Sequence, residues 1–204
     1  MADGCFVAFE GIEGAGKSTQ VALLASALRQ RGHEVVQTHE PGGTPFGQHL
    51  RRLVMQPGSE PPEPLTELLL YLADRAQHVV QIIRPALARG AVVLCDRFSG
   101  STIAYQGYGR GLDLETVIQL DACVRGGLRP DLVVLLDCQL ERGLERATGD
   151  DRIQREKIEF HRRVQKGFHQ LAAGDPSWKT ISTEGSPSEV AQSVLEVVTS
   201  LLPT

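Results

Sequence analysis

Residues 11–18 read Gly-Ile-Glu-Gly-Ala-Gly-Lys-Ser, and this stretch decides the fold because it fits the pattern GxxxxGK[ST]. It lies between an apolar run and a helical pattern, which is the context that the motif requires. Its glycines let backbone N–H groups turn inward around phosphate oxygens, and the helix N-terminus adds a favourable dipole. Lys17 is expected to reach the β- and γ-phosphates of ATP, and Ser18 to bind Mg²⁺. The predicted ATP-binding residues are Gly11, Ile12, Glu13, Gly14, Ala15, Gly16, Lys17, Ser18 and Thr19.

Outward from this loop, the chain alternates between strand and helix patterns. Apolar runs with the length of strands buried on both faces lie at 5–10, 91–96 and 132–137, and weaker candidates lie at 33–39 and 179–183. Helical patterns cover 17–31, 45–56, 64–89, 113–126, 139–147, 154–173 and 187–202. Helix N-termini are marked by Thr44-Pro45 and by a capping box at 186–189. The alternation predicts an α/β fold, a mostly parallel five-stranded sheet with helices on both faces.

Length and composition indicate one globular domain over residues 1–204. The chain has 41% hydrophobic residues, enough for a covered central sheet, and its net charge of -4 argues against a nucleic acid or an anionic membrane as partner. The N-terminus lacks a signal-peptide pattern, and no apolar stretch approaches the roughly 18 residues of a membrane span. The four cysteines form no CxxC pair, so we expect a reduced, cytoplasmic protein.

Charged residues follow several predicted strands, where doubly wound sheets bind their ligands. Asp96 could assist Mg²⁺ through water, and Arg97 could clamp a phosphate or pair with Asp96. Asp137 competes for the metal role, and we favour Asp96 because an arginine follows it. Glu40 lies in a Glu-Pro-Gly-Gly-Thr turn after another strand. Glu13 is unusual, because a carboxylate inside a cradle for anions must point away from the ATP phosphates, so we expect it to face the acceptor.

Two further groups of residues could form the acceptor site. Tyr71 and Arg75 are four residues apart, so on a helix they share a face and offer a ring to stack on a base and a donor for its carbonyl. The other group is expected in a polar, glycine-rich loop and consists of Ser101, Thr102, Tyr105 and Gln106. Gln106 can offer both a donor and an acceptor to a pyrimidine. Taken singly, such side chains more often serve packing or lie as surface charge than bind a ligand.

Taken together, the motifs resemble the thymidylate kinase family, bacterial type. The resemblance rests on EGIEGAGKST, HEPGGT, LLLYLADR, DRF followed by STIAYQGYGRG, and RPDLVVLLD, in order along nearly the whole chain. It implies a P-loop nucleoside monophosphate kinase fold with a short lid. It implies transfer of the γ-phosphoryl group of ATP to dTMP, giving dTDP and ADP in dTTP biosynthesis. It also implies a homodimer.

The resemblance assigns roles to individual residues. In the family, the residue matching Tyr71 stacks on thymine, those matching Arg51 and Arg97 bind the dTMP phosphate, and those matching Arg75 and Gln106 contact the base. The residue matching Tyr105 lies near the sugar, where a ribose 2′-hydroxyl would crowd it. The implied dTMP-binding residues are Glu40, Arg51, Tyr71, Arg75, Arg97, Ser101, Thr102, Tyr105 and Gln106. The implied catalytic residues are Lys17, Arg97, Arg152, Arg146 and Glu13.

The lid is expected at about 145–153, around an irregular Thr-Gly-Asp-Asp stretch. The phosphate-binding loop has no arginine among its variable residues, which is similar to family members whose catalytic arginines come from the lid. Arg152 is the first candidate and Arg146 the second. The sequence departs from the family at Tyr71, where phenylalanine is commoner, and at His39, where arginine is common and the charge is therefore left open.

Three other functions are compatible with the phosphate-binding loop. A regulatory GTPase needs an NKxD element for guanine, and this chain contains no asparagine. A non-catalytic nucleotide-binding module would not need Arg97, Gln106 or a lid. A kinase for another nucleotide or for a nucleoside is the main alternative, and thymidylate binding by Tyr71, Arg75 and Gln106 would exclude it.

Overall fold

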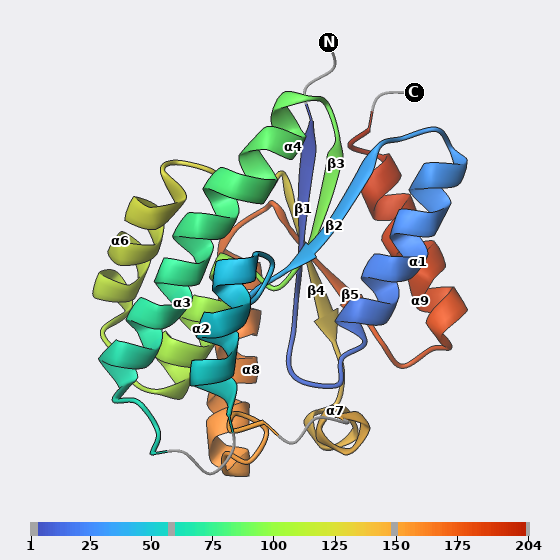
Figure 1. Cartoon of the computed structure of the whole chain (residues 1–204). Helices are drawn as coiled ribbons and strands as arrows, with labels where there is room; N and C mark the ends of the chain where they lie inside the picture. The colour runs from blue at the N-terminus through green and yellow to red at the C-terminus, as the bar shows by residue number, and fades with distance from the viewer. Residues whose placement is uncertain (1–3, 57–59, 148–150, 203–204) are drawn as a thin grey trace.

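The computed structural model describes residues 4–56, 60–147 and 151–202. At its centre is a five-stranded parallel sheet with the strand order β2-β3-β1-β4-β5 (Figure 1). The strands are β1 (Cys5–Glu10), β2 (Val35–His39), β3 (Val92–Asp96), β4 (Leu132–Asp137) and β5 (Trp178–Ser182). The predicted strands are thus confirmed, with ends that shift by two residues at most.

Helices cover both faces of this sheet, with α1 and α9 on one side and α3 on the other (Figure 1). Their bounds are α1 (Lys17–Gln30), α2 (Pro45–Met55), α3 (Pro64–His78), α4 (Arg84–Ala88), α6 (Leu114–Arg125), α7 (Leu140–Arg146), α8 (Ile158–Gly174) and α9 (Pro187–Thr199). Helix α3 runs through a π-helical turn, η1 (Val79–Ile83), into α4, as the single predicted helix at 64–89 requires. None of the helices in the described ranges is long and apolar enough to cross a membrane.

Capping chemistry explains the predicted starts of α2 and α9. Thr44 Oγ1 accepts a hydrogen bond from the Gly47 N–H at 2.9 Å, and Ser186 and Glu189 form the predicted capping box. Helix α8 starts later than predicted, at Ile158 rather than at residue 154. Turns occupy residues 152–155 instead.

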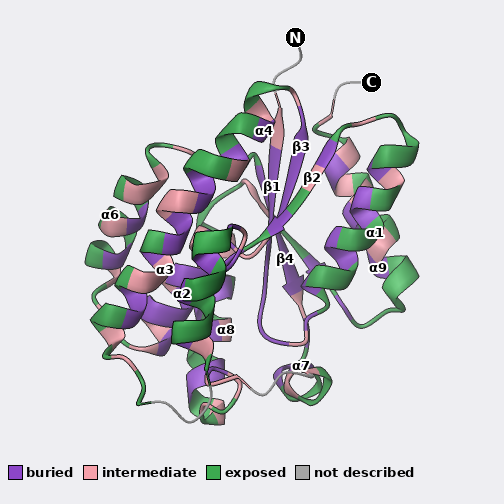
Figure 2. Ribbon diagram, in the orientation of Figure 1, coloured by how far each residue is buried: buried purple, intermediate pink, exposed green. Residues whose placement is uncertain are grey.

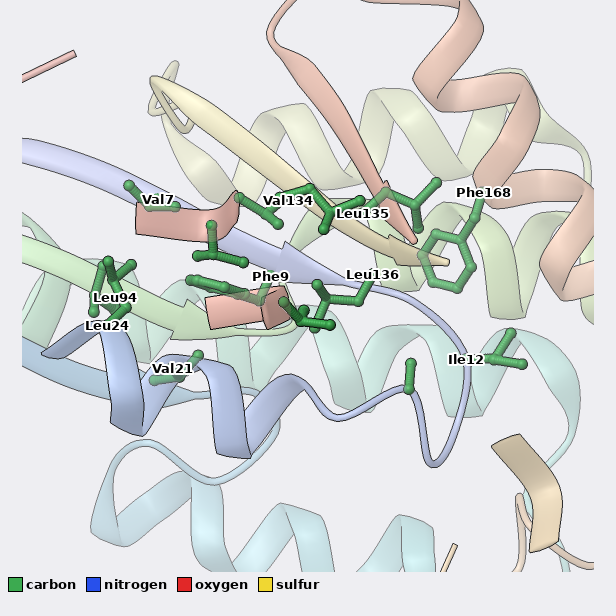
Figure 3. Close-up of a cluster of buried hydrophobic side chains, with 14 of the residues drawn as sticks. Val7, Phe9, Ile12, Val21, Leu24, Leu94, Val134, Leu135, Leu136 and Phe168 are labelled. Atoms are coloured by element: carbon green, nitrogen blue, oxygen red, sulfur yellow. The ribbon is translucent and has the colours of Figure 1, made fainter. Parts of the chain in front are cut away.

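Strand β1 is buried on both of its faces, as its apolar run predicts. Val7 and Phe9 belong to a cluster that includes Val21 and Leu24 of α1, and Figure 3 shows these side chains together. The alternate side chain Phe6 belongs to a second cluster on the other face, which includes residues of the α3-η1-α4 helix. The buried colour of the central strands in Figure 2 shows the same arrangement. The loop that follows β1 therefore starts from a strand that is packed on both faces.

The prediction of a loop after Arg97 is wrong. This segment forms α5 (Ser99–Thr102) and a π-helix, η2 (Ile103–Gly109). Glycines disfavour a helix because they lose the most backbone freedom, and that preference suggested a loop. Packing requires the small residue instead, because a Cβ at Gly109 would lie 2.7 Å from the ring of Phe160. Tertiary contacts thus override the local preference.

Candidate active site

The phosphate-binding loop joins the central strand β1 to α1. Gly14 and Gly16 have φ angles of 67° and 91°, a region that strongly favours glycine. A Cβ at Gly14 would also lie 1.8 Å from the carbonyl oxygen of Gly143 in α7, so the loop and this helix touch through their backbones. Residues 13–19 line a cavity of about 860 Å³. Of the predicted ATP-binding residues, only Gly11 and Ile12 lie outside the lining.

Lys17 is buried at the base of this loop. Its Nζ donates to the carbonyl oxygen of Gly11 at 3.0 Å and to that of Ile12 at 2.7 Å. Burial and then the charge of Arg97 lower the pKa of Lys17 to about 8. A phosphate near Nζ would favour the charged form. An anion bound in the cavity would therefore keep Lys17 protonated.

Ser18 and Asp96 come together at the mouth of the cavity, and both line it. Ser18 Oγ donates to Asp96 Oδ2 at 2.5 Å. Asp137, the competing candidate for the metal, has its Oδ1 2.9 Å from His169 Nε2. A hydroxyl and a carboxylate are hard oxygen ligands of the kind that Mg²⁺ prefers. The structure thus brings Ser18 and Asp96 together and leaves Asp137 with another partner.

A narrow pocket of about 40 Å³ adjoins the cavity and shares Glu13, Glu40 and Arg97 with it. The predicted acceptor residues that line it are Glu40, Tyr71, Arg75, Arg97, Ser101, Thr102, Tyr105 and Gln106. Arg51 lines the larger cavity instead. A space of this size holds about one water molecule. Met55 and Ile153 also line the narrow pocket.

Arg97 lies on the boundary between the two pockets. It has a φ of 70°, the single positive φ of a non-glycine residue in the described part of the chain. Its guanidinium donates to the Gly11 carbonyl and to Ser101 Oγ, each at 3.1 Å, and to Glu13 Oε1 at 3.1 Å. Of the two roles considered for Arg97, the pairing with Asp96 is therefore replaced by an ion pair with Glu13.

Glu13 is held on the acceptor side of its loop. Besides the bond from Arg97, its Oε1 accepts a hydrogen bond from Tyr105 Oη at 2.6 Å. Burial disfavours the charged form, but His161, Arg97, Lys17 and Tyr105 outweigh burial and lower the pKa of Glu13 to about 2. The carboxylate is therefore ionised and its charge is balanced locally.

Arg75 is the centre of a buried ionic network below the narrow pocket. Its Nε donates to Glu40 Oε2 at 2.8 Å, and its NH1 group donates to Thr102 Oγ1 at 2.8 Å and to Asp121 Oδ1 at 2.7 Å. His78 Nδ1 lies 2.7 Å from the other Glu40 oxygen. The guanidinium is thus fixed by residues from three other segments of the chain. Arg75 is therefore a rigid part of the pocket lining.

Glu67 binds Gln106, which is the second polar side chain considered in the lining of the same pocket. Its Oε1 accepts from Gln106 Nε2 at 2.9 Å and from Arg110 Nε at 3.1 Å. Its Oε2 accepts from Arg110 NH2 at 3.2 Å and from Arg152 NH2. The carboxylate is 1% exposed. Burial alone would raise its pKa, but the hydrogen bonds from Arg110 and Gln106 lower it on balance.

The two lid arginines differ in position. Arg146 ends α7, is exposed and lines the large cavity. Arg152, our first candidate, is not among its lining residues, because its side chain binds Glu67 and the carbonyl of Val54. The structure therefore favours Arg146 over Arg152 in this conformation. Residues 148–150 of the predicted lid lie outside the described residues.

Two features of the site went unrecognised in the sequence, a polar stripe on α3 and the far end of the cavity. Glu67, Tyr71, Asp74, Arg75 and His78 recur at helical spacing on one buried face, so the spacing of Tyr71 and Arg75 could have revealed the others. The far end of the cavity is lined by Gln20, Thr183, Gly185, Pro187 and Val190. These residues lie on α1 or near the start of α9, and none belongs to a predicted ligand-binding motif.

Comparison with known proteins decides the family. The sequence profile of the thymidylate kinase family matches residues 9–194. The chain belongs to the thymidylate kinase family. Among its relatives, the thymidylate kinase of Synechococcus sp. (strain JA-2-3B'a(2-13)) is 54% identical over 199 residues, which cover 97% of this chain and 96% of that protein. That of Geobacter sulfurreducens is 45% identical, covering 98% of this chain and 99% of that one.

The fold agrees with this membership. A crystal structure of thymidylate kinase from Ehrlichia chaffeensis superposes with a TM-score of 0.82 at 35% identity, covering 97% of this chain and 99% of that chain. His39 is the position at which the sequence left the charge open. Burial and then the neighbouring charge of Arg51 lower the pKa of His39, so Arg51 supplies the positive charge at that corner.

Proposed function

We propose that this chain is a thymidylate kinase that transfers the γ-phosphoryl group of ATP to dTMP, giving dTDP and ADP. The observation that carries the proposal is the joining of two pockets at Arg97 and Glu13. One pocket is formed by the phosphate-binding loop and the other by Tyr71, Arg75 and Gln106. A phosphoryl donor and acceptor bound in them would meet at the shared residues, as direct transfer requires.

Charge placement explains how the site would work. Phosphoryl transfer is catalysed mainly by positioning and by charge stabilisation. Lys17 would bind the β- and γ-phosphates of ATP, Arg97 the phosphate of dTMP, and Arg146 the transferring group. Ser18 and Asp96 would hold Mg²⁺, which neutralises phosphate charge when bound. In the described ranges no group of three or more His, Cys, Asp or Glu side chains is placed to hold a metal ion. Nucleotide phosphates would therefore supply the remaining ligands.

The narrow pocket would select the acceptor. The Tyr71 ring would stack on thymine, while Arg75 and Gln106 would bind the polar edge of the base. Arg51, which lines the large cavity, and Arg97, which lines both pockets, would bind the acceptor phosphate. Residues from the start of α9, at the other end of the large cavity, would contact the adenosine part of ATP.

An ADP-release assay across dTMP, dUMP, UMP, CMP, GMP and AMP tests this function. We expect dTMP to be the preferred acceptor and Lys17→Ala to lower kcat by at least about tenfold, equivalent to about 1.4 kcal/mol of transition-state stabilisation. Preference for another nucleotide would support the alternative kinase. ATP binding without turnover of any acceptor would support a non-catalytic module.

We further propose that the chain forms a homodimer through α2 and α3, which pack against each other. Five large apolar side chains on or directly after these helices are at least half exposed: Phe46, Leu53, Leu65, Leu69 and Val80. An apolar face of this kind marks an interaction surface. Light scattering after size exclusion should give twice the chain mass of 22.2 kDa. Leu69→Glu should shift the protein to monomer, whereas the exposed Leu23→Glu on α1 should not.

A further inference from the structure

We propose that Glu67 locks the side-chain amide of Gln106 in one orientation and thereby makes the acceptor pocket reject cytosine. This inference rests on the proposed function, because it concerns the acceptor of the same reaction. Glu67 would be a positioning residue that acts through Gln106. The sequence motifs assign it no role.

The orientation of Gln106 follows from the chemistry of its partner. Arg110 and Arg152 both bind the Glu67 carboxylate, which is buried and ionised. An ionised carboxylate can only accept hydrogen bonds. The amide of Gln106 must therefore turn Nε2 toward Glu67, and it does so at 2.9 Å. The flipped amide would bring two acceptor oxygens together in a buried site, which is strongly unfavourable.

A locked amide can match only one type of pyrimidine edge. With Nε2 held by Glu67, the pocket retains Oε1 as an acceptor and the second Nε2 hydrogen as a donor. Thymine and uracil have an N3–H donor beside carbonyl acceptors, whereas cytosine has an N3 acceptor beside an amino donor. With the base held in one position by stacking on Tyr71, which lines the same pocket, cytosine would match Gln106 only after the amide flipped. Glu67 opposes that flip. The pocket would therefore distinguish the two bases by the orientation of the Gln106 amide rather than by the shape of the base.

Arg110 keeps this arrangement rigid. Its guanidinium lies 4.6 Å from the centroid of the Phe160 ring, and its NH1 donates to Glu156 Oε1 at 2.5 Å. Both carboxylates thus neutralise the same arginine, but only Glu67 contacts Gln106 in these interactions. Glu156→Gln is therefore a matched control, since it removes a negative partner of Arg110 without touching the amide.

The test compares kcat/KM for dTMP and for dCMP in the wild type, Glu67→Gln and Glu156→Gln. The new amide of Glu67→Gln can donate to Gln106 Oε1, so Gln106 becomes free to flip. We expect the dTMP-to-dCMP ratio to fall by about tenfold or more, with an absolute gain on dCMP, and to change less than about twofold in Glu156→Gln. An unchanged ratio in Glu67→Gln, with both acceptors slowed equally, would mean a purely structural role and overturn the inference.

A second variant covers the case in which Glu67→Gln does not fold. Gln106→Leu retains the side-chain bulk and leaves Glu67 with its two arginines. Its dTMP-to-dCMP ratio should also fall by about tenfold or more, because no amide is left to read N3. A ratio equal to that of the wild type would overturn the inference while leaving the kinase function intact. A wild-type enzyme without dTMP turnover would overturn both.

Discussion

Tyr105 Oη and Glu13 Oε1 are 2.6 Å apart, in a hydrogen bond that joins the π-helix of the acceptor pocket to the phosphate-binding loop. The guanidinium of Arg97 lies 5.1 Å from the centroid of the Tyr105 ring and binds the same carboxylate oxygen. The three side chains therefore form one unit between donor and acceptor. A substitution of any one of them should therefore affect both the donor site and the acceptor site.

The first prediction separates the ring of Tyr105 from its hydroxyl. If the ring packs against the sugar, the wild type should prefer dTMP to its ribose counterpart by about tenfold or more in kcat/KM, because a buried unpaired hydroxyl costs about 1–3 kcal/mol. Tyr105→Phe should keep that preference and lower kcat. Tyr105→Leu should lose the preference. Equal use of both sugars by the wild type would show that Tyr105 does not read the sugar.

The second prediction concerns pH. Lys17 binds phosphate in its charged form, and burial lowers its pKa to about 8 in the free enzyme. kcat/KM for ATP should therefore fall as pH rises through about 8, whereas kcat should fall only at higher pH, because bound phosphates raise the pKa of Lys17. A profile of kcat/KM that stays level up to pH 10 would contradict this assignment.

The free energy of unfolding should respond to the ionisation of Lys17 in the opposite direction, because it should rise over a pH range in which kcat/KM for ATP falls. The pKa of Lys17 is about 8 in the folded chain against 10.5 for the free side chain. Between these values the unfolded chain binds more protons, so the free energy of unfolding gains a contribution that rises with pH. Denaturant titrations should show a smaller rise over that window in Lys17→Met than in the wild type. Parallel curves would mean that the lysine is not desolvated.

The third prediction concerns the lid arginines. Arg146 lines the large cavity, so Arg146→Ala should lower kcat by about 10²-fold while the dissociation constants of ATP and dTMP change only a few-fold. Arg152 is held by Glu67, and Arg152→Ala should act mainly on KM for dTMP. The reverse pattern, with the large loss of kcat in Arg152→Ala, would restore Arg152 as the catalytic arginine on closure of the lid.

The fourth prediction tests the backbone contact between α7 and the phosphate-binding loop. A Cβ at Gly143 would lie 2.8 Å from the carbonyl oxygen of Glu13, which cannot yield without moving the loop. Gly143→Ala should therefore weaken ATP binding by about tenfold, as a misplaced cradle would. Gly174→Ala is the matched control, because its Cβ would meet nothing within 4 Å. Unaltered ATP affinity in Gly143→Ala would rule out this coupling.

Much of the fold could be predicted from local patterns alone. Strand β1 and its neighbours β3 and β4 are apolar because both faces of the sheet are covered. Their burial can therefore be recognised directly in the sequence. The segment 99–109 could not be predicted in the same way. Gly100 and Gly109 are needed for contacts with Glu10 and Phe160, which are distant in the sequence. Local preference therefore pointed to the wrong structure.

The site residues also divide into those that a local pattern reveals and those that depend on long-range contacts. The phosphate-binding loop is contiguous, so its residues and their spacing could be recognised together. The network around Arg75 joins Glu40 and Asp121, which lie 35 and 46 residues away along the chain. No local pattern encodes such distances. The position of Arg152 against Glu67 depends on folding of the lid, so the ranking of Arg152 above Arg146 could not have been checked from sequence.

The left-handed backbone of Arg97 has a consequence for engineering. A non-glycine residue in this conformation is strained by about 1–2 kcal/mol. Glycine would relax that strain, yet it would remove the guanidinium that both pockets share. A screen for thermostable variants that ignores turnover could therefore enrich substitutions at this position that leave a well-folded but inactive protein. Position 97 should be kept fixed in any such library, and its tolerance measured by activity rather than by melting temperature.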